Sequence, residues 1–223
     1  MKEEPHLAIT ISMLRERIYS AVVLDSLDAV GLRRQSPRVP LVFRGGHSGP
    51  LVGRCKTTLW ADMSHPDDNP YGLELQAVDT CAADDVLIAA AGGSMRSGIW
   101  GELLSTAARN QGCVGAIVDG AVRDVHAMRA IGFPVFSRGT SPYDSRDRQR
   151  VIDVDVPVEI DGVLFSPGDL VIADDDGVVV VPQAVEEEVI RRAWEKINAE
   201  DTVRDSIRKG MTATEAFRKY GVL

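Results

Sequence analysis

An arginine and an aspartate stand side by side at Arg123-Asp124, a few residues after the apolar run from Val114 to Val118. A guanidinium binds a carboxylate or an enolate oxygen, and a carboxylate can hold a hard divalent cation. Upstream, a helix predicted to begin near Gly101 has free backbone N–H groups around Glu102 to Leu104, where the helix dipole favours an anion such as a carboxylate. If these groups meet in one place, together they suit the stabilisation of an enolate.

The residues from Ile88 to Asp124 predict the elements that would bring these groups together. An apolar strand leads into a glycine turn and then into an amphipathic helix, which Asn-Gln-Gly at 110–112 ends. The apolar face of this helix is predicted to be Leu103, Leu104, Ala107 and Ala108. The second strand, at 114–118, is a continuous apolar run, typical of a sheet that is covered on both faces. Residues just past the carboxyl end of such a strand line a crevice, so Arg123 and Asp124 are expected near the opening of the helix.

Neither part of this pattern is specific alone. An Arg-Asp pair after a strand is most often a solvated pair in a loop, and Gly92 and Gly93 need only supply a turn. The stretch holds no G-x-G-x-x-G fingerprint and no Walker phosphate loop, so nothing in it indicates a nucleotide cofactor.

The spacing resembles that of the family that contains the class II 4-hydroxy-4-methyl-2-oxoglutarate/4-carboxy-4-hydroxy-2-oxoadipate (HMG/CHA) aldolases and the RraA proteins. The family's aldolases show an acidic residue after glycine, then twenty residues, then Arg-Asp. Here Gly101-Glu102 is followed by residues 103 to 122 and then by Arg123-Asp124, and the intervening pattern runs in phase. The similarity extends from about Ser20 to Leu223.

Two positions depart from the family's pattern. Glu102 stands where the family usually has aspartate, and Ala127 stands where its aldolases have an acid three residues after Asp124. Both departures bear on the substrate, so a lyase or decarboxylase for a different keto acid is kept as an alternative.

The resemblance implies an α/β fold, an αββα sandwich around the swivelling β/β/α core that the family shares with phosphohistidine domains. Residues 1–223 would form a single domain, in which 182–223 are a helical arm for oligomerisation. The short strands expected between Val151 and Val181 agree with this fold, and Thr212 with Glu215 makes a capping box for a final helix. Family members associate as trimers or dimers of trimers, so a homotrimer or hexamer is expected.

The resemblance also implies a divalent cation, Mg²⁺ or Mn²⁺, as cofactor. Asp124 would be its direct ligand, with water in most other positions. Glu102 would hold a cation-bound water, and an acid on the arm of a neighbouring subunit would do the same. Glu200 is the candidate for that acid, although Glu195 is equally placed by spacing.

The function implied is a carbon–carbon lyase. It would cleave a 4-hydroxy-2-oxo acid, such as 4-hydroxy-4-methyl-2-oxoglutarate, by retro-aldol chemistry and would also decarboxylate oxaloacetate. Arg123 would bind the keto or enolate oxygen, and the cation-bound water that Glu102 holds would be the base that takes the proton of the substrate hydroxyl. The substrate carboxylate would be bound at Gly101 and Glu102 and by the N–H groups of Leu103 and Leu104.

A non-catalytic RraA-type protein that regulates a ribonuclease is the main alternative. Members without the aspartate after the arginine lack the cation ligand, so Asp124 favours the enzyme. A Schiff-base aldolase is disfavoured because the core from Ile88 to Asp124 holds no lysine.

Composition excludes several classes of protein. The 223 residues carry a net charge of −8 with no basic run, which argues against nucleic-acid binding. The N-terminus lacks the apolar segment of a signal peptide and no stretch is long enough to span a membrane, so a cytoplasmic location is expected. Cys55, Cys81 and Cys113 form no CxxC pair, which argues against disulfides and against a zinc site.

Other potential ligands are explained more simply as loop or surface residues, namely His47, His65, Asp67, Asp68, His126 and Asp174 to Asp176. Residues 7 to 31 are predicted to form one helix that Gly31 ends, and residues 137 to 150 are predicted to form a loop. Residues 183 to 209 are predicted to form a long helix.

Overall fold

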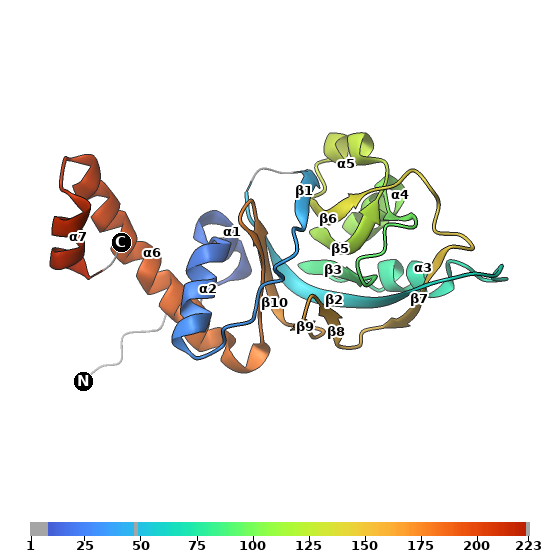
Figure 1. The fold of residues 1–223 in the computed structure, drawn as a ribbon, viewed down its shortest axis with the longest axis horizontal. Helices are drawn as coiled ribbons and strands as arrows, with labels where there is room; N and C mark the ends of the chain where they lie inside the picture. Colours follow the sequence, from blue (N-terminus) through green and yellow to red (C-terminus); the bar gives the residue numbers. More distant parts are fainter. Residues whose placement is uncertain (1–8, 47–48, 222–223) are drawn as a thin grey trace.

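A computed structural model describes residues 9–46 and 49–221 of the chain. Figure 1 shows a curled sheet with helices packed on it and a helical arm that extends to one end. The strands are β1 (Val42–Gly45), β2 (Leu51–Asp62), β3 (Asp85–Ala90), β4 (Gly98–Trp100), β5 (Gly115–Val122), β6 (Val135–Thr140), β7 (Gln149–Val154), β8 (Val158–Ile160), β9 (Val163–Phe165), β10 (Leu170–Asp174) and β11 (Gly177–Val181). The helices are α1 (Ile11–Arg17), α2 (Ser20–Ala29), α3 (Gly72–Asp79), α4 (Glu102–Asn110), α5 (Val125–Ile131), a 3-10 turn η1 (Gln183–Val185), α6 (Glu186–Arg208) and α7 (Ala213–Tyr220).

The main sheet has a parallel centre. Its strand order is β1-β6-β5-β3-β2-β10-β11, and β2, β3, β5 and β6 run parallel to one another. The short strand β4 also pairs with β5 in parallel, near its carboxyl end. Because β3 and β5 are parallel neighbours, the turn after β3 and the Arg-Asp pair after β5 leave the sheet at the same edge.

Helices cover one face of this parallel centre. Strand β5 is buried along its whole length, and the apolar run at 114–118 predicts this for its first part. Side chains such as Leu87, Val118 and Trp100 pack with those of α3, α4 and α5 on one face. Ile88 and Ile117 point to the other face, where the β8–β9 hairpin and strands β10 and β11 cover them. The mixed α/β architecture predicted from the sequence is therefore confirmed.

The N-terminal helical segment differs from the prediction. The prediction placed one helix at residues 7 to 31, of which 7 and 8 lie outside the described residues. The structure has two helices, because the chain is extended at Ile18 and Tyr19 between α1 and α2. Ile18 is nevertheless buried, together with α1, α2 and α6, against β10 and β11. The break lets both helices pack on the sheet.

The connection predicted at residues 137 to 150 is shorter than expected. Strand β6 continues to Thr140 and β7 begins at Gln149, so the loop is confined to the residues between them. Strand β4 was not predicted at all, because three residues are too few to show a period. These differences matter because β4 and the 141–148 loop both border the pocket described below.

The arm agrees with the sequence. Helix α6 runs from Glu186 to Arg208 and buries Val189, Ala193 and Ile197 in a helical stripe. Thr212 and Glu215 form the predicted capping box at the start of α7. Within the described residues, no helix combines the length and the apolar character needed to cross a lipid bilayer.

Candidate active site

Arg123 and Asp124 leave the sheet at the carboxyl end of β5. The N–H of Arg123 donates to the carbonyl oxygen of Trp100 at 2.8 Å, which ties the end of β5 to β4. Asp124 is the residue before α5 and has a left-handed backbone, with φ 55° and ψ 32°. Aspartate tolerates this conformation better than most residues do. The turn directs both side chains away from the core and toward α4.

The first turn of α4 opens on the same place. Gly101 precedes the helix and supplies no side-chain cap to the leading N–H groups. The helix start is held by Trp100, whose Nε1 donates to the hydroxyl of Ser105 at 2.8 Å. That hydroxyl donates in turn to the carbonyl oxygen of Gly101 at 2.8 Å. The amide donors are therefore fixed in position before any anion binds.

These groups line one pocket of about 300 Å³. Of the residues predicted for the site, Gly101, Leu103, Leu104, Arg123 and Asp124 all border it. A Cβ built on Gly101 would lie 2.6 Å from Oδ2 of Asp124, so only glycine lets the helix start approach this carboxylate so closely. The structure thus brings together most of the residues that the sequence predicted for the site.

The helical face predicted from the sequence was partly wrong. Leu103 is 76% exposed, whereas Ser105 and Ala108 are the buried residues of α4. Leu104 packs partly against the core. The buried face of α4 is therefore rotated relative to the predicted one, and the exposed Leu103 side chain borders the pocket.

The pocket also holds residues that the sequence did not indicate. Asp144, from the loop before β7, accepts a hydrogen bond from the hydroxyl of Tyr71 at 2.6 Å. Its Oδ1 lies 3.4 Å from Nη1 of Arg123, whose Nε lies 3.6 Å from Oδ2 of Asp124. The guanidinium is therefore held between two carboxylates and presented to the pocket.

These contacts keep Asp144 ionised. Burial works against its charge, but the hydrogen bond from Tyr71 and the nearby Arg123 guanidinium lower the pKa of Asp144 below its ordinary value. Conversely, burial and the bond to Asp144 raise the pKa of Tyr71 to about 12. The two residues form a stable pair near neutral pH.

Glu74 is a further pocket residue that the sequence did not indicate. It lies on α3, is 6% exposed, and borders the same pocket. Burial raises the pKa of Glu74 to about 8, and the negative charge of Asp144 adds to this rise while Arg123 opposes it. Among the described residues, its Oε2 has no hydrogen-bond partner. A carboxyl group in this position is protonated at neutral pH.

Glu74 should make the stability of the fold depend on pH. Its pKa rises from the ordinary 4.5 to about 8 on folding, so this contribution is full below pH 4.5 and is lost as pH rises through 8. We expect the free energy of unfolding to fall by about 2–5 kcal/mol between pH 4 and pH 9 through this group. Urea unfolding at both pH values measures this fall for the unchanged chain and for Glu74→Gln. The fall should be smaller in the variant. Equal pH dependence in both would contradict the assignment.

Glu102 is not among the residues that border the pocket. Its Oε1 accepts a hydrogen bond from the hydroxyl of Thr106 at 2.8 Å, one turn along α4. The structure therefore places the Glu102 carboxylate along its own helix, and its predicted part in the site requires the side chain to leave Thr106.

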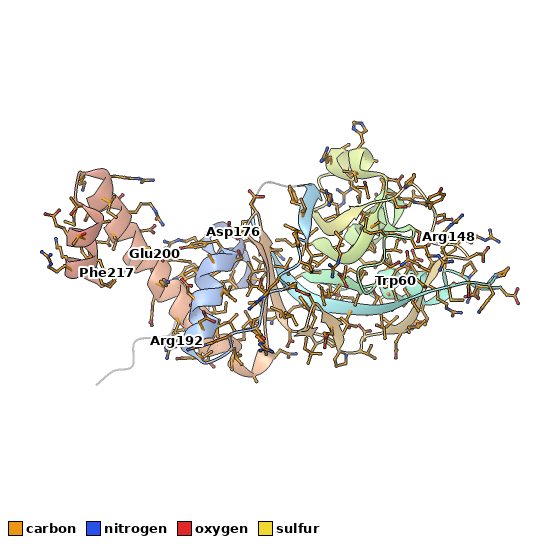
Figure 2. All side chains as sticks on the ribbon, viewed as in Figure 1. Trp60, Arg148, Asp176, Arg192, Glu200 and Phe217 are labelled. Carbon is orange, nitrogen blue, oxygen red and sulfur yellow. The ribbon has the colours of Figure 1, made fainter. Side chains whose placement is uncertain are left out.

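Glu200 lies far from the pocket of its own chain. Figure 2 shows it on the arm, well separated from Arg148, which belongs to the 141–148 loop that borders the pocket. Its carboxylate accepts a hydrogen bond from the Tyr19 hydroxyl and lies within 3.9 Å of Lys196. Its predicted role in the site of a neighbouring subunit stays a prediction.

Comparison with known proteins supplies the family. A model of the RraA-like family, described as Aldolase/RraA, matches residues 20–180. The chain belongs to the RraA-like family. The match begins at the start of α2, covers the sheet and the pocket, and ends before the arm.

Two curated relatives of this RraA-like chain match it over only part of their own length. The "Putative 4-hydroxy-4-methyl-2-oxoglutarate aldolase" of Halalkalibacterium halodurans is 37% identical over 131 residues, which are 59% of this chain and 61% of that protein. Protein DlpA of Legionella pneumophila is 31% identical over 201 residues, 90% of this chain but 32% of DlpA. The chain thus matches less than two thirds of the length of either relative.

Solved structures agree with the RraA-like fold. RraAS2 of Streptomyces coelicolor, described as an unusual member of the RNase ES inhibitor RraA protein family, is 31% identical. It has a TM-score of 0.75, and the match covers 90% of this chain and 98% of that one. An uncharacterized protein from Pseudomonas syringae has a TM-score of 0.83 at 25% identity, with 99% and 98% of the two chains covered. The latter match includes the arm.

The donor set of this RraA-like pocket fits a cation that is mostly hydrated. Within residues 9–46 and 49–221, no three His, Cys, Asp or Glu side chains are grouped as metal ligands. Asp144 is held by the Tyr71 hydroxyl as well as by Arg123, whereas among the described residues Asp124 is held by Arg123 alone, at 3.6 Å, which makes Asp124 the carboxylate better able to bind a cation. One carboxylate beside open pocket volume, with Gly101 leaving room at its Oδ2, suits Mg²⁺, which keeps several waters.

Proposed function

We propose that the protein is a divalent-metal-dependent pyruvate aldolase. It cleaves a 4-hydroxy-2-oxo acid, such as 4-hydroxy-4-methyl-2-oxoglutarate, and also decarboxylates oxaloacetate. The observation that carries this proposal is that Arg123, Asp124 and the first turn of α4 border one pocket. The name of the Halalkalibacterium halodurans relative supports the same reaction class.

Different residues of the pocket bind different groups of the substrate. The N–H groups of Leu103 and Leu104 bind the carboxylate next to the keto group, because an α-helix N-terminus favours an anion. Arg123 donates to the keto oxygen, and its fixed charge stabilises the negative oxygen that forms when the carbon–carbon bond breaks. Asp124 would hold Mg²⁺ or Mn²⁺, which supplies Lewis-acid polarisation of the keto group.

Aldol cleavage also needs a base for the substrate hydroxyl, and Glu102 is the proposed one. We expect Glu102→Gln to lower aldol cleavage about 10²-fold and to leave oxaloacetate decarboxylation within about threefold, because decarboxylation removes no hydroxyl proton. Pyruvate release from the two substrates measures this split. Thr106→Val frees the Glu102 carboxylate from its hydrogen bond and is the matched control, with cleavage equal to or above that of the unchanged chain. Equal losses in both reactions would remove Glu102 from the mechanism.

The arm is proposed to join subunits into a trimer or a hexamer. Glu200 would then approach the cation site of a neighbouring subunit and hold a water there. The Tyr19 hydroxyl and Lys196 position its carboxylate within the arm.

The second candidate function is regulation of a ribonuclease without catalysis. The likeness to RraAS2 of Streptomyces coelicolor favours it, since that protein is described as belonging to an RNase ES inhibitor family. The two candidates differ in what they require of Asp124, because binding another protein needs no cation in the pocket.

One assay tests the proposal. Pyruvate release is measured over a panel of 4-hydroxy-2-oxo acids and oxaloacetate, with Mg²⁺ or Mn²⁺ and again with a chelator. We expect release from at least one substrate, and we expect the chelator to abolish it. If no member of the panel released pyruvate, the proposal would be overturned, and regulation of a ribonuclease would be the remaining candidate function.

A further inference from the structure

The pocket contains a carboxyl group that the proposed mechanism does not use. Glu74 is 94% buried, and its Oε2 has no partner among the described residues. It borders the pocket from α3, which packs against α4. An unpaired buried polar atom costs free energy, so its place beside a cavity points to a ligand group that meets it there.

The proposed mechanism does not yet name the acid that protonates the enolate. Cleavage produces a pyruvate enolate, and the reaction ends only when C3 of that enolate gains a proton. Most charged groups that face Glu74 are committed elsewhere. Arg123 does not release a proton in proteins, Tyr71 donates its hydroxyl to Asp144, and Asp124 is assigned to the cation.

We propose that Glu74 is the acid that protonates C3 of the enolate. This inference rests on the proposed function. The O–H bond of Glu74 breaks and its proton forms a C–H bond with the electron pair of the enolate double bond. The enolate oxygen returns to a keto oxygen, and Glu74 is left as a carboxylate that regains a proton from water. Glu102 releases to water the proton that it took from the substrate hydroxyl, so both carboxyl groups are restored before the next cycle.

The electrostatics of the pocket support this step. Burial raises the pKa of Glu74 to about 8, Asp144 raises it further, and Arg123 opposes the rise. Glu74 therefore carries a proton at neutral pH, while the pKa of Asp144 is lowered and that of Tyr71 is raised to about 12. Neither of these neighbours exchanges a proton between pH 6 and pH 10.

Deuterium exchange into pyruvate tests the proposal directly. The unchanged chain is incubated with pyruvate and Mg²⁺ in D₂O, and loss of the methyl proton signal is followed by NMR. Exchange runs the step backwards, so it begins with the Glu74 carboxylate and its rate should rise as pH passes about 8. We expect Glu74→Gln to slow exchange about 10²-fold and to remove the rise. Asp79→Asn makes the same change at an exposed position of α3 and should exchange normally.

Binding is measured separately, so that a structural effect is recognised. Oxalate has the planar shape and charge of the enolate, and its inhibition constant should change less than threefold in Glu74→Gln. Exchange within threefold of the unchanged chain in this variant would overturn the proposal. A rate in the unchanged chain that does not rise through pH 8 would also overturn it, whether or not the variant folds. Pyruvate release from the substrate panel by the same preparation shows whether the proposed function itself holds.

Discussion

Replacing Arg123 with alanine is expected to lower pyruvate release by about 10²- to 10³-fold while the fold stays intact. The guanidinium is the fixed positive charge of the pocket, and loss of one donor that stabilises a developing oxyanion costs this much in known enzymes. The measurement is kcat/KM for the best substrate of the panel. Arg34→Ala removes an exposed arginine from the connector before β1 and serves as the control.

The stability of this variant should change little. The ion pairs of Arg123 with Asp124 and Asp144 are 3.4–3.6 Å long and more than one third exposed on each side, so each contributes about 1 kcal/mol or less. Arg123→Lys keeps the charge but loses the planar guanidinium with its paired donors. Its kcat/KM should therefore lie between the value for Arg123→Ala and the value for the unchanged chain. Near-normal turnover in Arg123→Ala, with unfolding also unchanged, would contradict the assignment of the keto oxygen to this residue.

The elements that frame the pocket were predictable because their signals are local. An apolar run predicts strand β5, and the glycine at 101 with the Asn-Gln-Gly sequence after Ala108 and Arg109 predicts where α4 begins and ends. Once two parallel strands and the intervening helix are recognised, the topology places Arg123 and Asp124 near the helix start. The central features of the pocket therefore follow from fewer than forty consecutive residues.

The remaining pocket residues carry no such local signal. Tyr71 and Glu74 come from α3 and its approach, and Asp144 comes from a loop that looks like any polar connection. Their meeting depends on how α3 packs on α4 and how the 141–148 loop passes over β4, and neither depends on a sequence period. Glu74 offered a weak clue, since Ala77 and Val78 follow it by three and four residues and therefore share its face of the helix.

A second kind of error came from side-chain direction. The sequence predicted that Leu103 packs on the sheet, but Leu103 is exposed. Glu102 bonds to Thr106, and its predicted role in the pocket stays a prediction. A small rotation of a helix exchanges such neighbours, and only packing determines it. Residue types near a helix N-terminus therefore predict where the helix begins better than they predict which side chain enters a pocket beside it.

Asp124→Asn is expected to abolish the dependence of activity on Mg²⁺ and to lower pyruvate release at least 10³-fold. The substitution removes the carboxylate charge that a hard cation needs but keeps a side chain that tolerates the left-handed backbone at φ 55°. Asparagine is therefore preferred to alanine, which would add backbone strain to the loss of the ligand. Asp28→Asn, at an exposed position of α2, is the control.

Gly101→Ala tests the same cation site without removing any ligand. Its Cβ would lie 2.6 Å from Oδ2 of Asp124, so the carboxylate has to move, whereas the backbone at φ −156° accepts alanine without strain. We expect the Mg²⁺ concentration for half-maximal activity to rise at least about tenfold, with part of the activity restored at high Mg²⁺. In Asp124→Asn no concentration of Mg²⁺ should restore it. If both variants responded to Mg²⁺ like the unchanged chain, the cation would have to bind elsewhere, and the role of Arg123 would need to be explained without it.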